Sequence, residues 1–276
     1  MQGKEIKRRL QGAQETIKIT RAMQLMSVAK MNKLQRKYYS SLAFLEEMKN
    51  ILSLLGNKKS VFTERRSGKK AYVIISSDKG LCGDYNYKLL SFADSILEQN
   101  EDVRVFVIGE YGKEYFARRG TKTDGSYASV MQNPVVEDAL NISKRLIEEY
   151  VNKLVDEVYV IYTEVDKSNG PQAQDPTVCK ILPLELEETE DTQNETLVDK
   201  KHIDGILEQY IWAMIYYALN SSGLAVNFKR MVAMQQATKN GEELAEKLTA
   251  TYNHLRQETI TNELIDAEIN KRGKHL

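Results

Sequence analysis

The sequence predicts an α/β protein: a long antiparallel coiled coil of N- and C-terminal helices, plus a central Rossmann-like α/β domain. Three observations predict this class. Both ends of the 276-residue chain carry sustained heptad repeats, which are typical of paired helices. The middle alternates short β-branched and aromatic runs with helical stretches, as in a mostly parallel sheet. Only four prolines interrupt the chain, which leaves long helices unkinked.

The first helix is predicted over residues 1–58. Alternating steps of four and three residues from Ile6 to Leu55 reach fifteen positions, of which eleven are apolar or aromatic. Fifty helical residues would span roughly 75 Å, much longer than a compact domain of this size needs. The segment AMQLM at residues 22–26 widens the apolar stripe, either as ordinary packing or as a second contact surface.

The last helix is predicted over residues 203–276. The same steps from Ile206 follow a heptad as far as Leu255, after which the apolar set shifts to Ile260, Leu264 and Ala267. Such drift is expected of a nearly straight helix that leaves a strict seven-residue repeat. The chain leaves one helix, builds the middle domain and returns, so antiparallel pairing is expected.

The central domain is predicted over residues 69–199. A loop rich in Gly, Pro, Asn and Asp is expected over 166–176, and the acidic segment 185–199 is interpreted as a linker. The predicted strands are 69–76, 103–109, 157–165 and 178–184, and the predicted helices are 85–99, 110–119 and 135–154.

Charge is unevenly spread although the whole chain is neutral. Residues 1–40 carry ten lysines and arginines against two glutamates. This basic face is either a solvated helix flank or a contact for an anionic membrane or an acidic protein. Stacking aromatics are not interleaved with the bases, so we expect no nucleic acid. No apolar run is long enough to span a membrane or to serve as a signal peptide.

The segment SSDKGLCGDYN, residues 76–86, is the one stretch that resembles the start of a phosphate-binding or reactive-thiol loop. The Gly-Lys-Ser/Thr ending of a P-loop and the third glycine of a dinucleotide fingerprint are missing, and Asp84 would repel phosphate. Cys82 has no base nearby in sequence and no CxxC partner in Cys179, which favours inert thiols in a reducing compartment. The histidines lack metal-ligand spacing.

We therefore expect no catalytic residue, cofactor or metal. The segment is instead interpreted as a tight turn in which Gly80 and Gly83 supply positive φ angles or close packing.

Three segments together resemble the gamma subunit of bacterial F-type ATP synthase, in that family's order and across essentially the whole chain. They are IKITRAMQLMSVAKMNKLQ (17–35), SSDKGLCGDYN (76–86), and the pair KRMVAMQQATKNGEEL (229–244) and NHLRQETITNEL (253–264). The resemblance implies a non-catalytic central-stalk rotor that turns inside the ring of three alpha and three beta subunits. It would couple ion flow to ATP synthesis or hydrolysis at the beta subunits.

The implied partners are the alpha and beta subunits, the epsilon subunit and the c-ring of the membrane sector. The implied location is peripheral, on the cytoplasmic face of the bacterial inner membrane, without direct membrane insertion. The resemblance also implies candidate contacts with the beta subunits. These are Lys18, Arg21, Met23, Asp78, Lys79, Cys82, Arg230, Gln257 and Thr261.

The chain departs from the family pattern in three places. Ser221 and Val226 stand where the family usually has glutamates, and the tip AEINKRGKHL is charged. The dithiol insertion of the chloroplast type is not present, so we expect no thiol switch. Two other readings stay open. One is a small α/β metabolite- or nucleotide-binding enzyme domain clasped by a helical pair, and the other is a basic coiled-coil scaffold.

Overall fold

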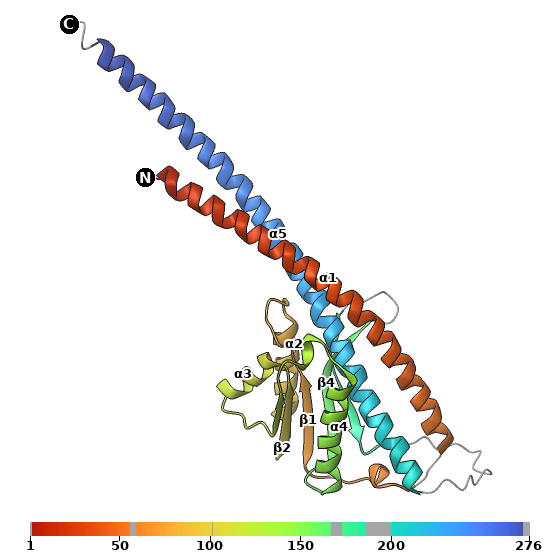
Figure 1. The fold of residues 1–276 in the computed structure, drawn as a ribbon. Helices are drawn as coiled ribbons and strands as arrows, with labels where there is room; N and C mark the ends of the chain where they lie inside the picture. The colour runs from red at the N-terminus through yellow and green to blue at the C-terminus, as the bar shows by residue number, and fades with distance from the viewer. Residues whose placement is uncertain (1, 56–58, 101, 167–172, 186–199, 273–276) are drawn as a thin grey trace. The chain divides into compact units, whose positions relative to one another are not determined.

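The structure, a computed structural model, describes residues 2–55, 59–100, 102–166, 173–185 and 200–272 (Figure 1). Two long helices, α1 (Gln2–Leu55) and α5 (Lys200–Arg272), are the first and the last of the described elements along the sequence. The chain divides into two compact units. We call Met1–Met26 with Met231–Leu276 the helical unit, and Ser27–Arg230 the sheet unit.

One five-stranded sheet in the order β3-β2-β1-β4-β5 forms the centre of the sheet unit. Strands β1 to β4 pair in parallel, and β5 pairs antiparallel with β4 at one edge. This is the mostly parallel sheet that the alternating pattern predicts. The strands are β1 (Lys70–Ile75), β2 (Val103–Ile108), β3 (Gly125–Tyr127), β4 (Glu157–Val165) and β5 (Ala173–Leu182).

Three α-helices and one short 3-10 turn lie between the strands, and a second 3-10 turn precedes β1. The bounds of the helices agree with the sequence prediction to within three residues. They are α2 (Tyr85–Leu97), α3 (Glu110–Arg118) and α4 (Val136–Val151), with η1 (Val61–Thr63) and η2 (Val130–Gln132).

Two strands differ from the prediction. The sequence pattern misses β3 entirely. The segment 166–176, predicted as a loop, overlaps β5, which begins at Ala173 and includes Pro176 opposite Thr163. Proline is tolerated there because β5 lies at the sheet edge, where no further strand needs its missing N–H. The predicted acidic linker lies outside the described residues except for Glu185.

The core of the sheet unit joins the sheet to both long helices. Residues 71–75 of β1 are almost fully buried, as expected of a central parallel strand covered on both faces. Tyr38 of α1 packs against Tyr217 of α5 with ring centroids 5.6 Å apart, and Phe44 stacks on Trp212 at 5.3 Å. The C-terminal half of α1 and the N-terminal part of α5 thus belong to the core of the sheet unit.

The heptad prediction is confirmed position by position. All fifteen predicted seam positions from Ile6 to Leu55 are buried or half-buried, and so are all those from Ile206 to Leu255. The helices run antiparallel within each unit, because Tyr38 meets Tyr217 in the sheet unit and Thr20 meets Thr238 in the helical unit.

Candidate partner-contact surfaces

The segment 76–86 connects β1 to α2 at the carboxyl edge of the sheet. Ser76, at its start, is buried; its hydroxyl donates to the carbonyl of Ile108 (2.8 Å) and accepts from the backbone N–H of Gly112 (2.9 Å). A Cβ atom at Gly109 would lie 2.5 Å from the Ser76 carbonyl oxygen. Glycine at that position therefore lets β2 and α3 close against the loop.

A small polar core holds the loop from inside. The backbone N–H of Ser77 donates to Oδ1 of Asn86 (3.2 Å), and Nδ2 of Asn86 lies 3.4 Å from Sγ of Cys82. Cys82 is only 2% exposed, and burial raises the pKa of its thiol. A buried thiol with a raised pKa is a poor nucleophile, in agreement with the predicted inert role.

The turn takes its shape from two left-handed residues, Leu81 (φ 58°) and Gly83 (φ 61°). The prediction for Gly83 is confirmed. The prediction for Gly80 is wrong, because its φ is not positive and a Cβ atom there would meet nothing within 4 Å. Leu81 takes the second left-handed position instead, with 63% of its surface exposed. An exposed apolar side chain on a strained backbone makes the loop tip a candidate contact surface.

Asp78 ties the loop to the neighbouring elements. Its Oδ1 accepts from the backbone N–H groups of Glu110 at the start of α3 (3.3 Å) and of Ser129 (3.0 Å). Burial raises the pKa of this carboxyl, although these hydrogen bonds act in the opposite direction. Asp78 is thus engaged within the chain, whereas Lys79 beside it is exposed.

Two basic residues of α5 reach the same loop. Arg230 donates from Nη2 to the carbonyl of Lys79 (2.9 Å) and from Nε to that of Gly80 (3.4 Å). Lys229 forms an ion pair with Asp84 (3.0 Å). Burial lowers the pKa of Arg230, but a guanidinium stays charged at neutral pH. Sequence patterns miss this contact, because about 150 residues separate its partners.

The crevice between β1 and β4, where a doubly wound sheet usually binds ligands, is filled by the chain itself. Tyr85 is 2% exposed and its hydroxyl donates to the Ile75 carbonyl (3.3 Å). Ser221 donates to the Thr163 carbonyl (3.0 Å), and Ser222 accepts from the Thr163 N–H (3.3 Å). The polar groups at this edge bind α5, which argues against the small-enzyme reading.

Both departures from the family pattern on α5 lie in the interior. Ser221 is fully buried through its contact with β4, and Val226 is 4% exposed. A charged side chain at either position would be costly to bury without a partner. These two positions therefore serve packing in this chain.

Five of the predicted contact residues lie in the helical unit. Lys18 and Arg21 are exposed on α1, and Met23 beside them is half-buried. Arg21 pairs with Glu242 of α5 (2.5 Å). On the exposed face of α5, the Thr261 hydroxyl donates back to the carbonyl of Gln257 (2.9 Å).

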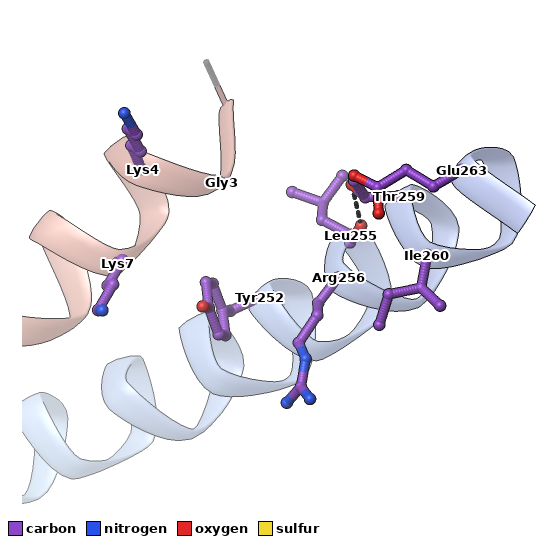
Figure 2. A pocket seen from close by; sticks show the side chains of 9 residues that line it. All are labelled: Gly3, Lys4, Lys7, Tyr252, Leu255, Arg256, Thr259, Ile260 and Glu263. Carbon is purple, nitrogen blue, oxygen red and sulfur yellow. Dashed lines mark hydrogen bonds between the residues drawn. The ribbon is translucent and has the colours of Figure 1, made fainter.

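An open groove of about 760 Å³ lies where α1 begins (Figure 2). Past this groove α5 extends beyond the first described residues of α1 (Figure 1), and Leu264 and Ile265 are at least 50% exposed. Among the described residues no helix lies opposite this part of α5 (Figure 1), which accounts for the exposure together with the heptad drift. The groove is lined by Gly3, Lys4, Lys7, Tyr252, Leu255, Arg256, Thr259, Ile260 and Glu263.

The described residues contain neither a membrane-spanning helix nor a metal-binding cluster. None of the helices in those residues is both long enough and apolar enough to cross a membrane. Within the same ranges, no three His, Cys, Asp or Glu side chains are grouped closely enough to hold a metal ion.

Comparison with known proteins identifies the family. Residues 2–268 match the ATP synthase family. The ATP synthase gamma chain of Caldanaerobacter subterraneus subsp. tengcongensis is 33% identical, over 95% of this chain and 97% of that protein. That of Alkaliphilus metalliredigens is 32% identical over 95% of each chain. The fold is also similar to a chain of the Euglena gracilis mitochondrial ATP synthase, with a TM-score of 0.73, 13% identity, and coverage of 99% and 95% of the two chains. The chain thus belongs to the ATP synthase gamma chain family.

Proposed function

We propose that the chain is the central-stalk rotor subunit of an F-type ATP synthase. It would turn inside the ring of alpha and beta subunits and couple transmembrane ion flow to ATP synthesis or hydrolysis at the beta subunits. The observation that carries this proposal is the 33% identity to ATP synthase gamma chains along 95% of the chain. The chain itself supplies contacts, and the phosphoryl chemistry belongs to its partners.

The paired helices suit a rotating shaft. Their seam is continuous from Ile6 to Leu55 on α1 and from Ile206 to Leu255 on α5. Past the seam, α5 alone presents apolar side chains such as Leu264. A shaft whose sides differ in shape makes different contacts with each surrounding subunit as it turns. Such differential contacts are what any coupling between distant sites requires.

We divide the chain by role into shaft helices, 1–58 and 203–276, and a central α/β domain, 69–199. On the shaft we propose Lys18, Arg21, Met23, Gln257 and Thr261 as beta-subunit contacts. In the sheet unit the proposed contacts are Asp78, Lys79, Cys82 and Arg230.

Burial ranks the contacts proposed in the sheet unit. Lys79 is exposed, whereas Cys82 is buried and Asp78 and Arg230 are half-buried and bonded within the chain. A partner that touches the loop would therefore meet Lys79 and Leu81 directly. Cys82, Asp78 and Arg230 would act indirectly, by holding the loop that exposes Lys79 and Leu81.

The further partners that we propose are the epsilon subunit and the c-ring, and the proposed location is the cytoplasmic face of the bacterial inner membrane. The basic first part of α1 supports an acidic partner surface. Lys18 is exposed there, and electrostatic attraction can guide a moving contact without locking it.

Affinity capture of the tagged full-length chain from its own cells tests the proposal. Alpha and beta subunits should be recovered in equal amounts, and the captured complex should hydrolyse ATP. An untagged strain processed in parallel is the control for nonspecific recovery. Failure to recover alpha and beta under gentle, low-salt conditions would overturn the proposal.

A second measurement separates the proposal from the enzyme reading. The full-length chain purified alone should show no ATP turnover above a mock preparation from cells that lack it. Turnover that co-purifies with the chain through two different columns would favour a catalytic domain instead.

A further inference from the structure

We propose that Arg230 is a positioning residue, whose guanidinium clasps the loop 76–84 to α5 and holds the loop tip at Leu81 in one conformation. The clasp can be tested without any partner, and its consequence for coupling rests on the proposed function.

The contacts of Arg230 have the form of a clamp. Nη2 and Nε donate to two consecutive carbonyls of the loop, those of Lys79 and Gly80, at 2.9 and 3.4 Å. Nη1 donates to Oδ1 of Asn227, one turn earlier on α5, at 3.2 Å. The planar fork of arginine is thus anchored on its own helix while it holds the loop, a geometry that a lysine cannot reproduce.

The loop needs such a restraint. Leu81 and Gly83 both adopt left-handed backbone conformations, and for a residue with a side chain this is unfavourable. The Lys79 carbonyl also accepts from the Ser77 hydroxyl at 2.9 Å. Arg230 therefore completes a network that starts in the polar core of the loop and ends on α5.

Other contacts hold the loop from the opposite side. Asp78 binds the backbone at the start of α3 and at Ser129. The loop is thereby bonded both to the sheet edge and to α5. A displacement of α5 relative to the loop would have to break the Arg230 bonds, which join the loop to a half-buried side chain of that helix.

The neighbouring ion pair between Lys229 and Asp84 offers a matched control. It joins the same helix to the same loop at 3.0 Å, but the carboxylate is half exposed and the Lys229 side chain is 27% exposed. Exposed pairs of this kind contribute little to stability. If the clasp is specific, the loss of Lys229 should matter much less than the loss of Arg230.

Two cysteines report on the clasp. Cys82 is a residue of the loop whose side chain is buried, so it should react with N-ethylmaleimide only when the loop opens. Cys179 on β5 makes its sulfur contact with the Lys180 carbonyl (3.6 Å), away from the loop, and serves as an internal reference. Alkylation of each residue in the full-length chain is followed by peptide mass spectrometry.

We expect Arg230→Ala to raise the alkylation rate of Cys82 about tenfold, since a charged hydrogen bond is worth roughly that factor in an opening equilibrium. The rate at Cys179 should not change. Arg230→Lys should give a smaller rise, and Lys229→Ala a rise below threefold. The proposal is overturned if Arg230→Ala changes Cys82 less than threefold, if both cysteines accelerate together, or if Lys229→Ala matches Arg230→Ala.

A second measurement uses the complex assembled with the captured alpha and beta subunits and its membrane sector. Arg230→Ala should assemble yet move fewer ions per ATP, and Arg230→Lys should recover part of that ratio. If the unmodified chain does not assemble, the proposed function fails while the alkylation result stands. If Arg230→Ala opens the loop but leaves the ratio unchanged, the clasp has no part in coupling.

Discussion

Two glycines of one loop should respond in opposite ways to the same substitution. Gly83 has a φ of +61°, whereas the φ of Gly80, three residues earlier, is not in the left-handed region. A Cβ atom at either position would meet nothing within 4 Å. Alanine at these two positions therefore tests backbone conformation alone, without a steric clash.

The magnitude follows from that difference. A residue with a side chain loses about 1–2 kcal/mol in the left-handed region, so Gly83→Ala should lower the free energy of unfolding by about that amount. Gly80→Ala restricts the unfolded chain without straining the folded one, and should raise it by up to about 1 kcal/mol. For a unit of this size each kcal/mol corresponds to roughly 2–4 °C in Tm.

Thermal unfolding followed by far-ultraviolet circular dichroism, with the two variants measured side by side, provides the assay. We expect Gly83→Ala to melt several degrees below the unmodified chain and Gly80→Ala to melt at or slightly above it. Equal shifts for both variants, or a larger loss at Gly80, would refute the reasoning from φ angles.

Four further predictions follow from the described contacts. Leu81→Gly relieves the strain of a left-handed φ in the folded chain but increases the conformational entropy of the unfolded chain, so Tm should stay within about 2 °C. Capture of alpha and beta subunits should weaken. A large loss of Tm would contradict the exposed position of Leu81. Asp78→Asn keeps the carbonyl acceptor and removes the buried charge, so at pH 7 it should melt no lower than the unmodified chain. Because burial raises the pKa of Asp78 in the folded chain, the ionised carboxyl lowers the free energy of unfolding at neutral pH. This loss is relieved as pH falls and the carboxyl is protonated, so the difference in Tm between the variant and the unmodified chain should shrink. The hydroxyls of Thr20 and Thr238 lie 2.7 Å apart, and each is also within hydrogen-bond distance of a backbone carbonyl of its own helix, so one hydroxyl donates to the other and the second donates to its carbonyl. Each single Val substitution should cost about 0.5–1.5 kcal/mol and the double about the same as one, which urea denaturation of a double-mutant cycle can measure. Leu264→Ser should leave Tm unchanged, because that side chain is 66% exposed, and should reduce capture of the ring; a drop in Tm would show a partner within the chain.

The coiled coil is the part of the fold that the sequence predicts most completely. Its signal is local and repeated, so each heptad supports the next, and the seam holds from Ile6 to Leu55 on α1 and from Ile206 to Leu255 on α5. The central strands are equally readable, since buried parallel strands are continuous apolar runs. β3 carries no such signal. It has three residues, Gly125–Tyr127, and forms because the Tyr127 carbonyl accepts from the Gly109 N–H (2.9 Å).

The candidate site could be predicted only in part. The segment 76–86 is visible as a loop from its two glycines, but the sequence cannot show that Leu81 rather than Gly80 takes the left-handed position. The contact of Arg230 with the backbone of that loop leaves no side-chain pattern to read, because its acceptors are carbonyl groups. Burial of Cys82 likewise depends on how α2 docks.

The strand order of the sheet explains how a fold that usually binds ligands can instead hold the helix α5. Parallel strands that part at a switch point leave a crevice at their carboxyl ends. In this chain Tyr85 occupies that edge, and Ser221 and Ser222 satisfy the backbone of Thr163. The backbone groups of Thr163, which could otherwise bind a ligand, are hydrogen-bonded to α5. The shaft helix therefore occupies the position where a ligand would bind. The loop beside the crevice is fastened to that helix by Arg230, and what it presents outward is Leu81. Occupation of the crevice by the rotor's own helix therefore accounts both for a loop without catalytic chemistry and for its rigid attachment to the shaft.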